Sequence, residues 1–240
     1  KDKNTTYNGK EQHFAEVWGL DASKFVAKGQ VSGTNAGEYQ ATYYSDDQHG
    51  YDFIGNEGTL TINKAQVTIT GSSESDKIYN GQNQSMSSPG YTVEGMVNGE
   101  NATLLGTITA SGATGKDAGS YTNKVTGENQ STQNYDIHYV DGKLTINKKK
   151  ITVTALDETR EYNGFNQAVN GFKADGLVNG EDESVLVNSV NALATRKDAG
   201  TYDHLVAYKN ANGDKNYEIT FQKGTYIITK ANVTVKADSL

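Results

Sequence analysis

Residues 134–148 read NYDIHYVDGKLTINK, and this stretch carries the clearest indication of the fold. Apolar and polar residues alternate in it twice, once over 135–140 and again over 143–146. A period of two is typical of β-strands with one buried face. On this pattern His138 faces solvent. The Asp141-Gly142 step between the two runs predicts either a hairpin turn or a bulge within one long strand.

The end of this stretch closes three successive segments of the chain. It reads GTLTINK at 58–64, GKLTINK at 142–148 and GTYIITK at 224–230. Two further motifs keep the same order, namely Tyr-Asn-Gly beginning at Tyr7, Tyr79 and Tyr162, and Ala-Gly-x-Tyr ending at Tyr39, Tyr121 and Tyr202. Three motifs that share one period of about 80 residues indicate a tandem array.

The motifs divide the chain into repeat 1 (residues 1–63), repeat 2 (64–147) and repeat 3 (148–229). Residues 230–240 match the opening strand of a further repeat, so we expect the chain to be part of a longer array. Repeat 1 begins after its opening strand and lacks the Asn-Gly-Glu loop that the other two repeats carry at 98–100 and 179–181. A unit of this size buries only about 60–65% of its unfolded surface, so contacts between repeats could add stability.

The fold class follows from the strand patterns and from the turns between them. The chain holds 15 Tyr and 26 Gly but a single Pro, which suits many strands joined by Gly and Asn turns. The Ala-Gly-x-Tyr motif is similar to the tyrosine corner of immunoglobulin-like sandwiches, with Tyr39, Tyr121 and Tyr202 at the structural corner position. We predict an all-β tandem array of small immunoglobulin-like β-sandwich units. Ubiquitin-like β-grasp units, with a short helix near the Asn-Gly-Glu segment, are the alternative.

Residues 91–100 and 134–148 resemble the MBG and YDG repeat modules of large bacterial surface proteins. The pattern of that family runs from a strand through Tyr-[Asn/Asp]-Gly, a segment ending in Val-Asn-Gly-[Glu/Asp] and the Ala-Gly-x-Tyr corner to the closing strand. The resemblance covers the whole chain and is strongest in repeats 2 and 3. It implies a secreted, wall-anchored or outer-surface multidomain protein, often an adhesin or a stalk, whose motifs are structural and not catalytic.

Composition argues against several functional classes. The chain has no Cys, which removes disulfides, thiolate metal sites and cysteine nucleophiles. Its net charge of −7 argues against a nucleic-acid partner and against an anionic membrane surface. The sequence has no run of about 18 apolar residues, so we expect no transmembrane helix. Its four histidines lack metal-ligand spacing, and it has no serine-nucleophile elbow. We therefore expect neither an enzyme nor a cofactor.

Three weaker kinds of site stay open. The acidic pairs Asp157-Glu158 and Asp182-Glu183 offer oxygen ligands for calcium but lack the spaced ligand loop. His49 lies in an acidic turn that could hold a metal weakly. Three lysines that end strands in register could form Lys–Asn isopeptide bonds, although a plain junction role explains them as well: Lys64, Lys148 and Lys230.

Two functions fit these observations. The first is a structural spacer or stalk, in which stacked repeats of a bacterial cell-surface protein present a distal adhesive domain. The second is an adhesin module whose repeats themselves bind host mucin, glycan or matrix protein. Tyrosines often carry such binding, and Tyr43, Tyr44 and Tyr51 of the irregular repeat 1 are the ligand-binding candidates. In either case we expect a monomer at the bacterial cell surface or cell wall, without membrane contact through this segment.

Overall fold

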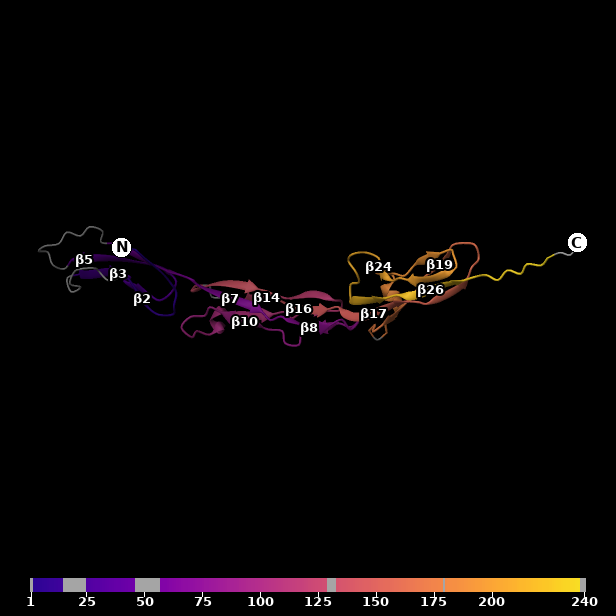
Figure 1. Ribbon diagram of the computed structural model, residues 1–240. Coiled ribbons are helices and arrows are strands. Elements are labelled where there is room, and N and C mark those ends of the chain that lie inside the picture. Colours follow the sequence, from indigo (N-terminus) through magenta and orange to yellow (C-terminus); the bar gives the residue numbers. More distant parts are fainter. Residues whose placement is uncertain (1, 15–24, 46–56, 129–132, 179, 238–240) are drawn as a thin grey trace. The chain divides into compact units, whose positions relative to one another are not determined.

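The computed structural model describes residues 2–14, 25–45, 57–128, 133–178 and 180–237 (Figure 1). These residues belong to two compact units. Unit 1 comprises Lys1–Ser73, Ser87–Ala113 and Thr122–Lys143. Unit 2 comprises Glu74–Met86, Thr114–Tyr121 and Leu144–Leu240. Repeat 2 therefore contributes to both units, and each unit contains one boundary between successive repeats.

The described residues form strands joined by turns, so the all-β prediction is confirmed. Repeat 1 holds β1 (Lys3–Thr6), β2 (Gln12–His13), β3 (Phe25–Gly29), β4 (Ser32–Gly33), β5 (Gly37–Ser45) and β6 (Glu57–Asn63). Repeat 2 holds β7 (Ala65–Gly71), β8 (Glu74–Ile78), β9 (Gln84–Ser85), β10 (Tyr91–Glu94), β11 (Thr107–Ala110), β12 (Thr114–Gly115), β13 (Gly119–Asn123), β14 (Val125–Glu128), β15 (Tyr135–Val140) and β16 (Gly142–Asn147). Repeat 3 holds β17 (Lys149–Ala155), β18 (Glu158–Glu161), β19 (Gln167–Val169), β20 (Phe172–Asp175), β21 (Val190–Asn191), β22 (Ala194–Arg196), β23 (Gly200–His204), β24 (Ala207–Tyr208), β25 (Tyr217–Gln222) and β26 (Gly224–Thr229).

Two short 3-10 helices complete the described elements. They are η2 (Ala102–Leu105) and η3 (Glu183–Leu186), and each follows an Asn-Gly-Glu segment. This is where the β-grasp alternative places a short helix. The side chains of Asn101 and Asp182 cap them by accepting a backbone N–H two residues further along.

The opening strand of repeats 2 and 3 runs parallel to the last strand but one of the same repeat. In unit 2, β17 pairs in parallel with β25 from Lys149 opposite Tyr217 to Thr154 opposite Gln222, and it pairs antiparallel with β20. In unit 1, β7 lies in the same way between β15 and β10, and β1 is parallel to β6. Because parallel strands cannot be joined by a hairpin, the chain enters a repeat at one end and leaves it at the other. Such a module can be repeated in tandem without reversing the chain.

The Asp-Gly step is neither the hairpin turn nor the bulge that the sequence predicts. β15 and β16 do not pair with each other, and the register is the same before the step, with Val140 opposite Thr70, and after it, with Leu144 opposite Glu74. β15 pairs with β7, whereas β16 pairs with β8, so the step moves the chain from one partner strand to the next. A Cβ added at Gly142 would lie 2.0 Å from the backbone oxygen of Ser72, so only glycine fits there. Asp141 Oδ1 accepts the backbone N–H of Val125 at 2.9 Å and so holds the step in place.

The alternating apolar residues form the core, and His138 is exposed as its position in the pattern predicts. In unit 1 the buried cluster draws on two repeats: Tyr7, Leu60, Ile62, Ala65, Val67, Ile69, Leu105, Val125 and Tyr135. Tyr7, Leu60 and Ile62 come from repeat 1 and the others from repeat 2. In unit 2 a further cluster gathers around Tyr226 and Ile228 of β26. Successive repeats in unit 1 therefore share one apolar core across their boundary.

The strand after the corner carries a buried position that differs between repeats. Ala41, Asn123 and His204 occupy it with exposed fractions of 3%, 0% and 0%. Asn123 Nδ2 donates to the backbone oxygen of Ser72 at 3.1 Å. His204 Nδ1 lies 2.6 Å from the backbone oxygen of Leu156, the residue in register with Ser72. Since buried polar groups require partners, Asn123 and His204 connect the corner strand to the residue after the opening strand with two different side chains.

Candidate functional site: the junction between successive repeats

One glutamate of repeat 2 binds tyrosines from two repeats. Glu100 Oε1 accepts the hydroxyl of Tyr7 of repeat 1 at 2.5 Å, and Glu100 Oε2 accepts the hydroxyl of Tyr135. The two rings meet edge to face, with centroids 5.5 Å apart and planes at 83°. Both tyrosines are buried. We call this group, with the residues that support it, the first junction.

The same arrangement recurs in unit 2 between repeats 2 and 3. Glu181 Oε2 accepts the hydroxyl of Tyr217 at 2.6 Å, and Glu181 Oε1 accepts the hydroxyl of Tyr79. The rings again meet edge to face, with centroids 5.4 Å apart. We call this group the second junction. Because two separate boundaries have one geometry, the geometry belongs to the repeated motifs and not to a single site.

The Tyr-Asn-Gly motif places its tyrosine where a strand ends. The N–H of Tyr7 donates to the backbone oxygen of Asn63 at 2.8 Å, which extends the pairing of β1 with β6 by one residue. Asn8 Oδ1 then accepts the N–H of Lys10 at 2.9 Å and turns the chain. Tyr79 and Asn80 repeat both features. The motif thus anchors the ring at the end of its repeat.

The Asn-Gly-Glu loop aims its glutamate by a tight turn. Asn98 and Gly99 have φ values of 52° and 74°, which reverse the chain within two residues. The N–H of Glu100 donates to the backbone oxygen of Val97 at 2.9 Å and closes the turn. The hydroxyl of Tyr135 accepts the N–H of Val97 at 3.2 Å. The loop and Tyr135 therefore contact each other within repeat 2, independently of repeat 1.

The asparagine that precedes the closing-strand tyrosine makes a second bond across each junction. Asn134 Oδ1 accepts the N–H of Ala36 at 2.8 Å. Asn216 Oδ1 accepts the N–H of Ala118 at 2.9 Å. These alanines belong to the Ala-Gly-x-Tyr motifs of the preceding repeats. The motif therefore has two roles, because its tyrosine supports its own repeat while its alanine bonds to the next.

Close packing makes the motif glycine necessary at both junctions. A Cβ added at Gly9 would lie 2.6 Å from Cβ of Asn98, and one at Gly81 would lie 3.0 Å from Cγ2 of Val178. Gly164 of repeat 3 has the same left-handed conformation, with a φ of 81°, but among the described residues no atom beyond its chain neighbours lies within 4 Å of an added Cβ. The first two glycines are therefore required by the next repeat as well as by their backbone conformation.

The junctions keep their phenols neutral. Burial raises the pKa of Tyr7 to about 12, and the hydrogen bond to Glu100 adds to the rise. Burial, followed by the bond to Glu181, raises the pKa of Tyr217 to about 12. The pKa values of Tyr79 and Tyr135 are raised for the same reasons. The phenols act as donors to a carboxylate, so each junction contains a pair of charge-assisted hydrogen bonds.

The predicted corner tyrosines each donate to upstream backbone. The hydroxyls of Tyr39, Tyr121 and Tyr202 bond the backbone oxygens of the residues four positions earlier at 2.8, 2.9 and 2.9 Å. These residues are Asn35, Asp117 and Asp198, next to the alanines of the junctions. The corner thus positions the alanine that bonds to the following repeat.

The ligand-binding candidates of repeat 1 stay predictions. Tyr43 and Tyr44 lie in β5, and their side chains are outside the described part of the chain. Tyr51 and His49 also lie outside the described residues.

Several of the weaker site candidates have structural partners. Asp157 Oδ1 accepts the N–H of Thr225 at 2.7 Å, Asp182 caps η3, and Glu183 Oε1 accepts the N–H of Ala174 at 3.1 Å. Within the described ranges, no three His, Cys, Asp or Glu residues are grouped so that they could hold a metal ion. The three lysines proposed for isopeptide bonds are exposed: Lys64, Lys148 and Lys230.

Sequence reasoning missed the role of the glutamates. The Asn-Gly-Glu pattern by itself indicates only a loop, and Tyr-Asn-Gly by itself only a turn. A signal was present, because Glu100 and Glu181 occur in register although a turn does not need a carboxylate. The alternation around Tyr135 and Tyr217 indicates only strand residues, and their ring partners lie in the preceding repeat.

These features define a tandem array of small all-β modules joined by a repeated junction. A family model described as MBG domain (YGX type) matches residues 67–145 and 151–227. The two matches together cover well over half of the chain, and the chain belongs to this MBG domain family. The resemblance seen in the motifs is thereby confirmed for repeats 2 and 3.

Comparisons with individual proteins add little. A search of curated proteins gave no match. Among solved structures, the chain is similar to the crystal structure of the I9-I11 tandem from titin, with 12% identity over 96% of this chain and 97% of that chain. The TM-score is 0.25, which supports no conclusion about fold or function. Within the described residues, none of the helices has the length and apolar character needed to cross a membrane.

Proposed function

We propose that these MBG repeats are a structural spacer in a bacterial cell-surface protein and present a distal adhesive domain. The proposal rests on the position of the repeated motifs, which lie at the junctions between repeats. Each of the two junctions uses a Tyr-Asn-Gly tyrosine, an Asn-Gly-Glu glutamate, a corner alanine and an Asn-Tyr pair. A spacer needs its repeated residues where modules join, because its length depends on nearest-neighbour contacts. A binding module would instead need them on an open surface.

Small-angle X-ray scattering tests the spacer role. A compact globule of this length has a radius of gyration of about 18 Å. The spacer proposal predicts a clearly larger value for the wild-type chain. It also predicts a broader distance distribution for the double variant Glu100→Ala/Glu181→Ala at unchanged strand content by circular dichroism. The control Glu94→Ala/Glu218→Ala changes exposed strand carboxylates and should scatter like wild type. A wild-type value near that of the globule would exclude a spacer.

A binding screen separates the spacer from an adhesin. The spacer proposal predicts no saturable binding to glycan arrays, mucins or matrix proteins. Binding that is weakened by Tyr43→Ala or Tyr44→Ala would assign the adhesive role to repeat 1 itself and contradict the proposal.

A further inference from the structure

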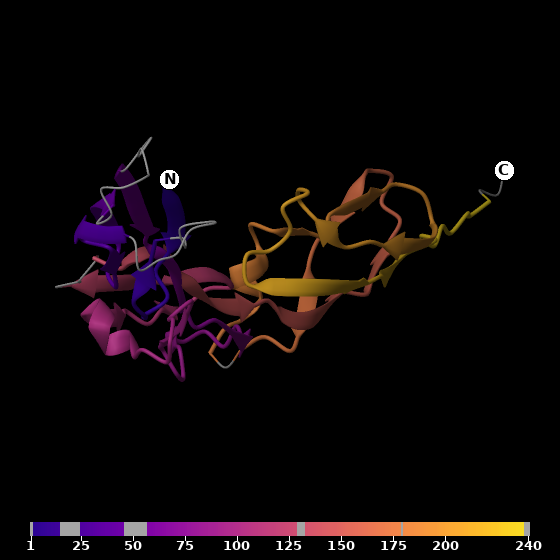
Figure 2. The same ribbon diagram turned by 90° about the vertical axis from the view of Figure 1, so that its left-hand side faces the viewer.

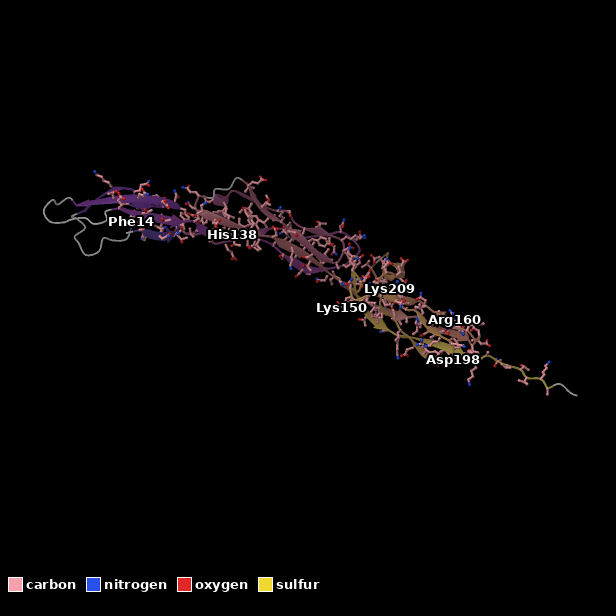
Figure 3. The ribbon with its side chains drawn as sticks, turned by 90° about the horizontal axis from the view of Figure 1, so that it is seen from above. Phe14, His138, Lys150, Arg160, Asp198 and Lys209 are labelled. Atoms are coloured by element: carbon pink, nitrogen blue, oxygen red, sulfur yellow. The ribbon has the colours of Figure 1, made fainter. Side chains whose placement is uncertain are left out.

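We infer that repeat 3 ends in a docking socket for a further MBG repeat that carries an Asn-Gly-Glu loop and an Asn-Tyr closing strand; this inference rests on the proposed spacer function. The socket consists of Tyr162, Asn163, Gly164, Asp198 and Ala199. These residues are in register with those that the two junctions use in repeats 1 and 2. A surface hollow at the socket is lined by Tyr162, Asp198, Ala199, Lys230, Ala231 and Val233. Figure 3 shows Asp198 close to where the final segment of the chain leaves repeat 3.

The socket has the same internal structure as the occupied sites. The N–H of Tyr162 donates to the backbone oxygen of Thr229 at 2.9 Å, as Tyr7 and Tyr79 donate to their closing strands. Asn163 Oδ1 accepts the N–H of Phe165 at 3.0 Å, which forms the same turn. The socket is therefore formed before any partner binds, which lowers the conformational cost of docking.

Exposure distinguishes this socket from the junctions. Tyr162 is 38% exposed, whereas Tyr7 and Tyr79 are 6% and 4% exposed. The rings that are edge to face with Tyr7 and Tyr79 come from the following repeat. What Tyr162 lacks is thus the part that the next repeat supplies at the other two sites.

The segment after β26 points to the same occupant. Val233 and Val235 are 83% and 88% exposed, although they are in register with Val67 and Ile69 of β7, which are fully buried. In Figures 1 and 2 this segment extends away from the sheets of repeat 3. An MBG repeat continuing from Lys230 would bury these two valines as its opening strand and bring its glutamate over Tyr162.

The chemistry of the socket defines its partner. By analogy with Tyr7 and Tyr79, the hydroxyl of Tyr162 would donate to a carboxylate, and its ring would pack against the edge of a second aromatic ring. The N–H of Ala199 calls for an amide oxygen like that of Asn134 or Asn216. An Asn-Gly-Glu loop beside an Asn-Tyr pair supplies all three groups. Asp198 is in register with Asp117, which pairs with Lys215 at the second junction, so a lysine before the Asn-Tyr pair would also fit.

Tyrosine nitration measured by mass spectrometry tests the socket. In the 240-residue chain, Tyr162 should react about tenfold faster than Tyr7 or Tyr79, because reaction at buried rings requires local opening. In an extended chain, with a copy of residues 65–147 joined directly to Lys230, nitration of Tyr162 should fall to the rate of Tyr79. The substitution Glu100→Ala in the copy alone should restore fast nitration, whereas Glu94→Ala in the copy should not.

A second variant guards against misfolding of the added copy. Gly164→Ala should lower the thermal midpoint more in the extended chain than in the 240-residue chain, because only the former places atoms next to residue 164. Equal nitration of Tyr162 in both chains, with a protease-resistant copy, would overturn the inference. Scattering separates this result from the spacer role: protected Tyr162 without a gain in radius of gyration would contradict the spacer but support the socket.

Discussion

The two junctions share their centre and differ at their margin. Each has a glutamate between two phenols and an asparagine that accepts the N–H of a corner alanine. At the margin of the second junction, Asp117 pairs with Lys215 at 2.5 Å and accepts Asn216 Nδ2 at 3.1 Å. At the first junction the residues in register are neutral, and Asn134 Nδ2 donates to Asn35 Oδ1 at 3.0 Å.

This difference distinguishes the central residues, which join successive repeats at both junctions, from the marginal residues, which differ between the two junctions. The four tyrosines of the shared centre are buried and its glutamates are partly buried, so a change there leaves donors or acceptors without partners. The margin is exposed, with the Lys215 side chain at 69%, so solvent can replace its bonds. We therefore expect substitutions at the centre to affect both junctions strongly and substitutions at the margin to affect one junction weakly.

High pH should open both junctions and produce the largest effect. The phenols of Tyr7 and Tyr217 have pKa values raised from 10.0 to about 12, so they favour the folded state in their neutral form. Their contribution is complete below pH 10 and is lost as the pH rises from about 10 through 12. Absorbance of tyrosinate and near-ultraviolet circular dichroism should change together over this range. Ionisation of all tyrosines near pH 10 without a change in dichroism would contradict the account.

Removal of one central carboxylate should be the next largest effect. Glu181→Ala leaves the hydroxyls of Tyr79 and Tyr217 buried without their acceptor, at a cost of about 1–3 kcal/mol each. Urea unfolding followed by circular dichroism should show a loss of about 3 kcal/mol. The control Glu218→Ala removes an exposed carboxylate from the same repeat and should stay within about 0.5 kcal/mol of wild type. Equal losses for the two variants would show that the glutamate has no special role.

Removal of one phenol hydroxyl should have a smaller effect that depends on position. Tyr79→Phe deletes a charge-assisted bond to Glu181 and should lower the free energy of unfolding by about 1.5–3 kcal/mol. Tyr162→Phe is the matched control, because this hydroxyl has no partner among the described residues and should change stability by less than about 0.5 kcal/mol. The comparison fails if both substitutions cost the same.

The margin should respond least. Lys215→Gln gives the second junction the residue that Gln133 provides in register at the first. It should leave the urea midpoint almost unchanged, since exposed ion pairs contribute little. The difference from wild type should shrink further at high salt. A loss as large as that of Glu181→Ala would remove the distinction between centre and margin.

Local periodicity allowed the sequence to predict much of the fold. The alternation in 135–146 indicates the strands and their buried face. Asp141-Gly142 separates two strands that pair with different partners, and it is neither the hairpin turn nor the bulge that the sequence predicts. The tyrosine corner could be recognised because Tyr121 and its acceptor Asp117 are four residues apart. The parallel pairing of β7 with β15 was not foreseen, since no local pattern reports which distant strand lies alongside.

The junction could not be derived from the sequence for a related reason. Tyr7 and Glu100 are 93 positions apart, and each has a sufficient local explanation as a turn residue. The φ of 73° at Gly9 is likewise a sufficient local reason for a glycine, and only the structure shows the next repeat packed against it. A residue that forms a turn and also contacts the next repeat is already explained by the turn. Only its recurrence in register in other repeats suggests a second role.

Amide hydrogen exchange in the wild-type chain tests whether the repeated motifs hold successive repeats together. The N–H groups of Ala36 and Ala118 donate across a junction, whereas Ala199 occupies the same motif in repeat 3, where the socket is open. We predict that the N–H groups of Ala36 and Ala118 exchange at least about a hundredfold more slowly than that of Ala199 at neutral pH. Similar exchange rates for all three alanines would show that the repeated motifs do not hold successive repeats together.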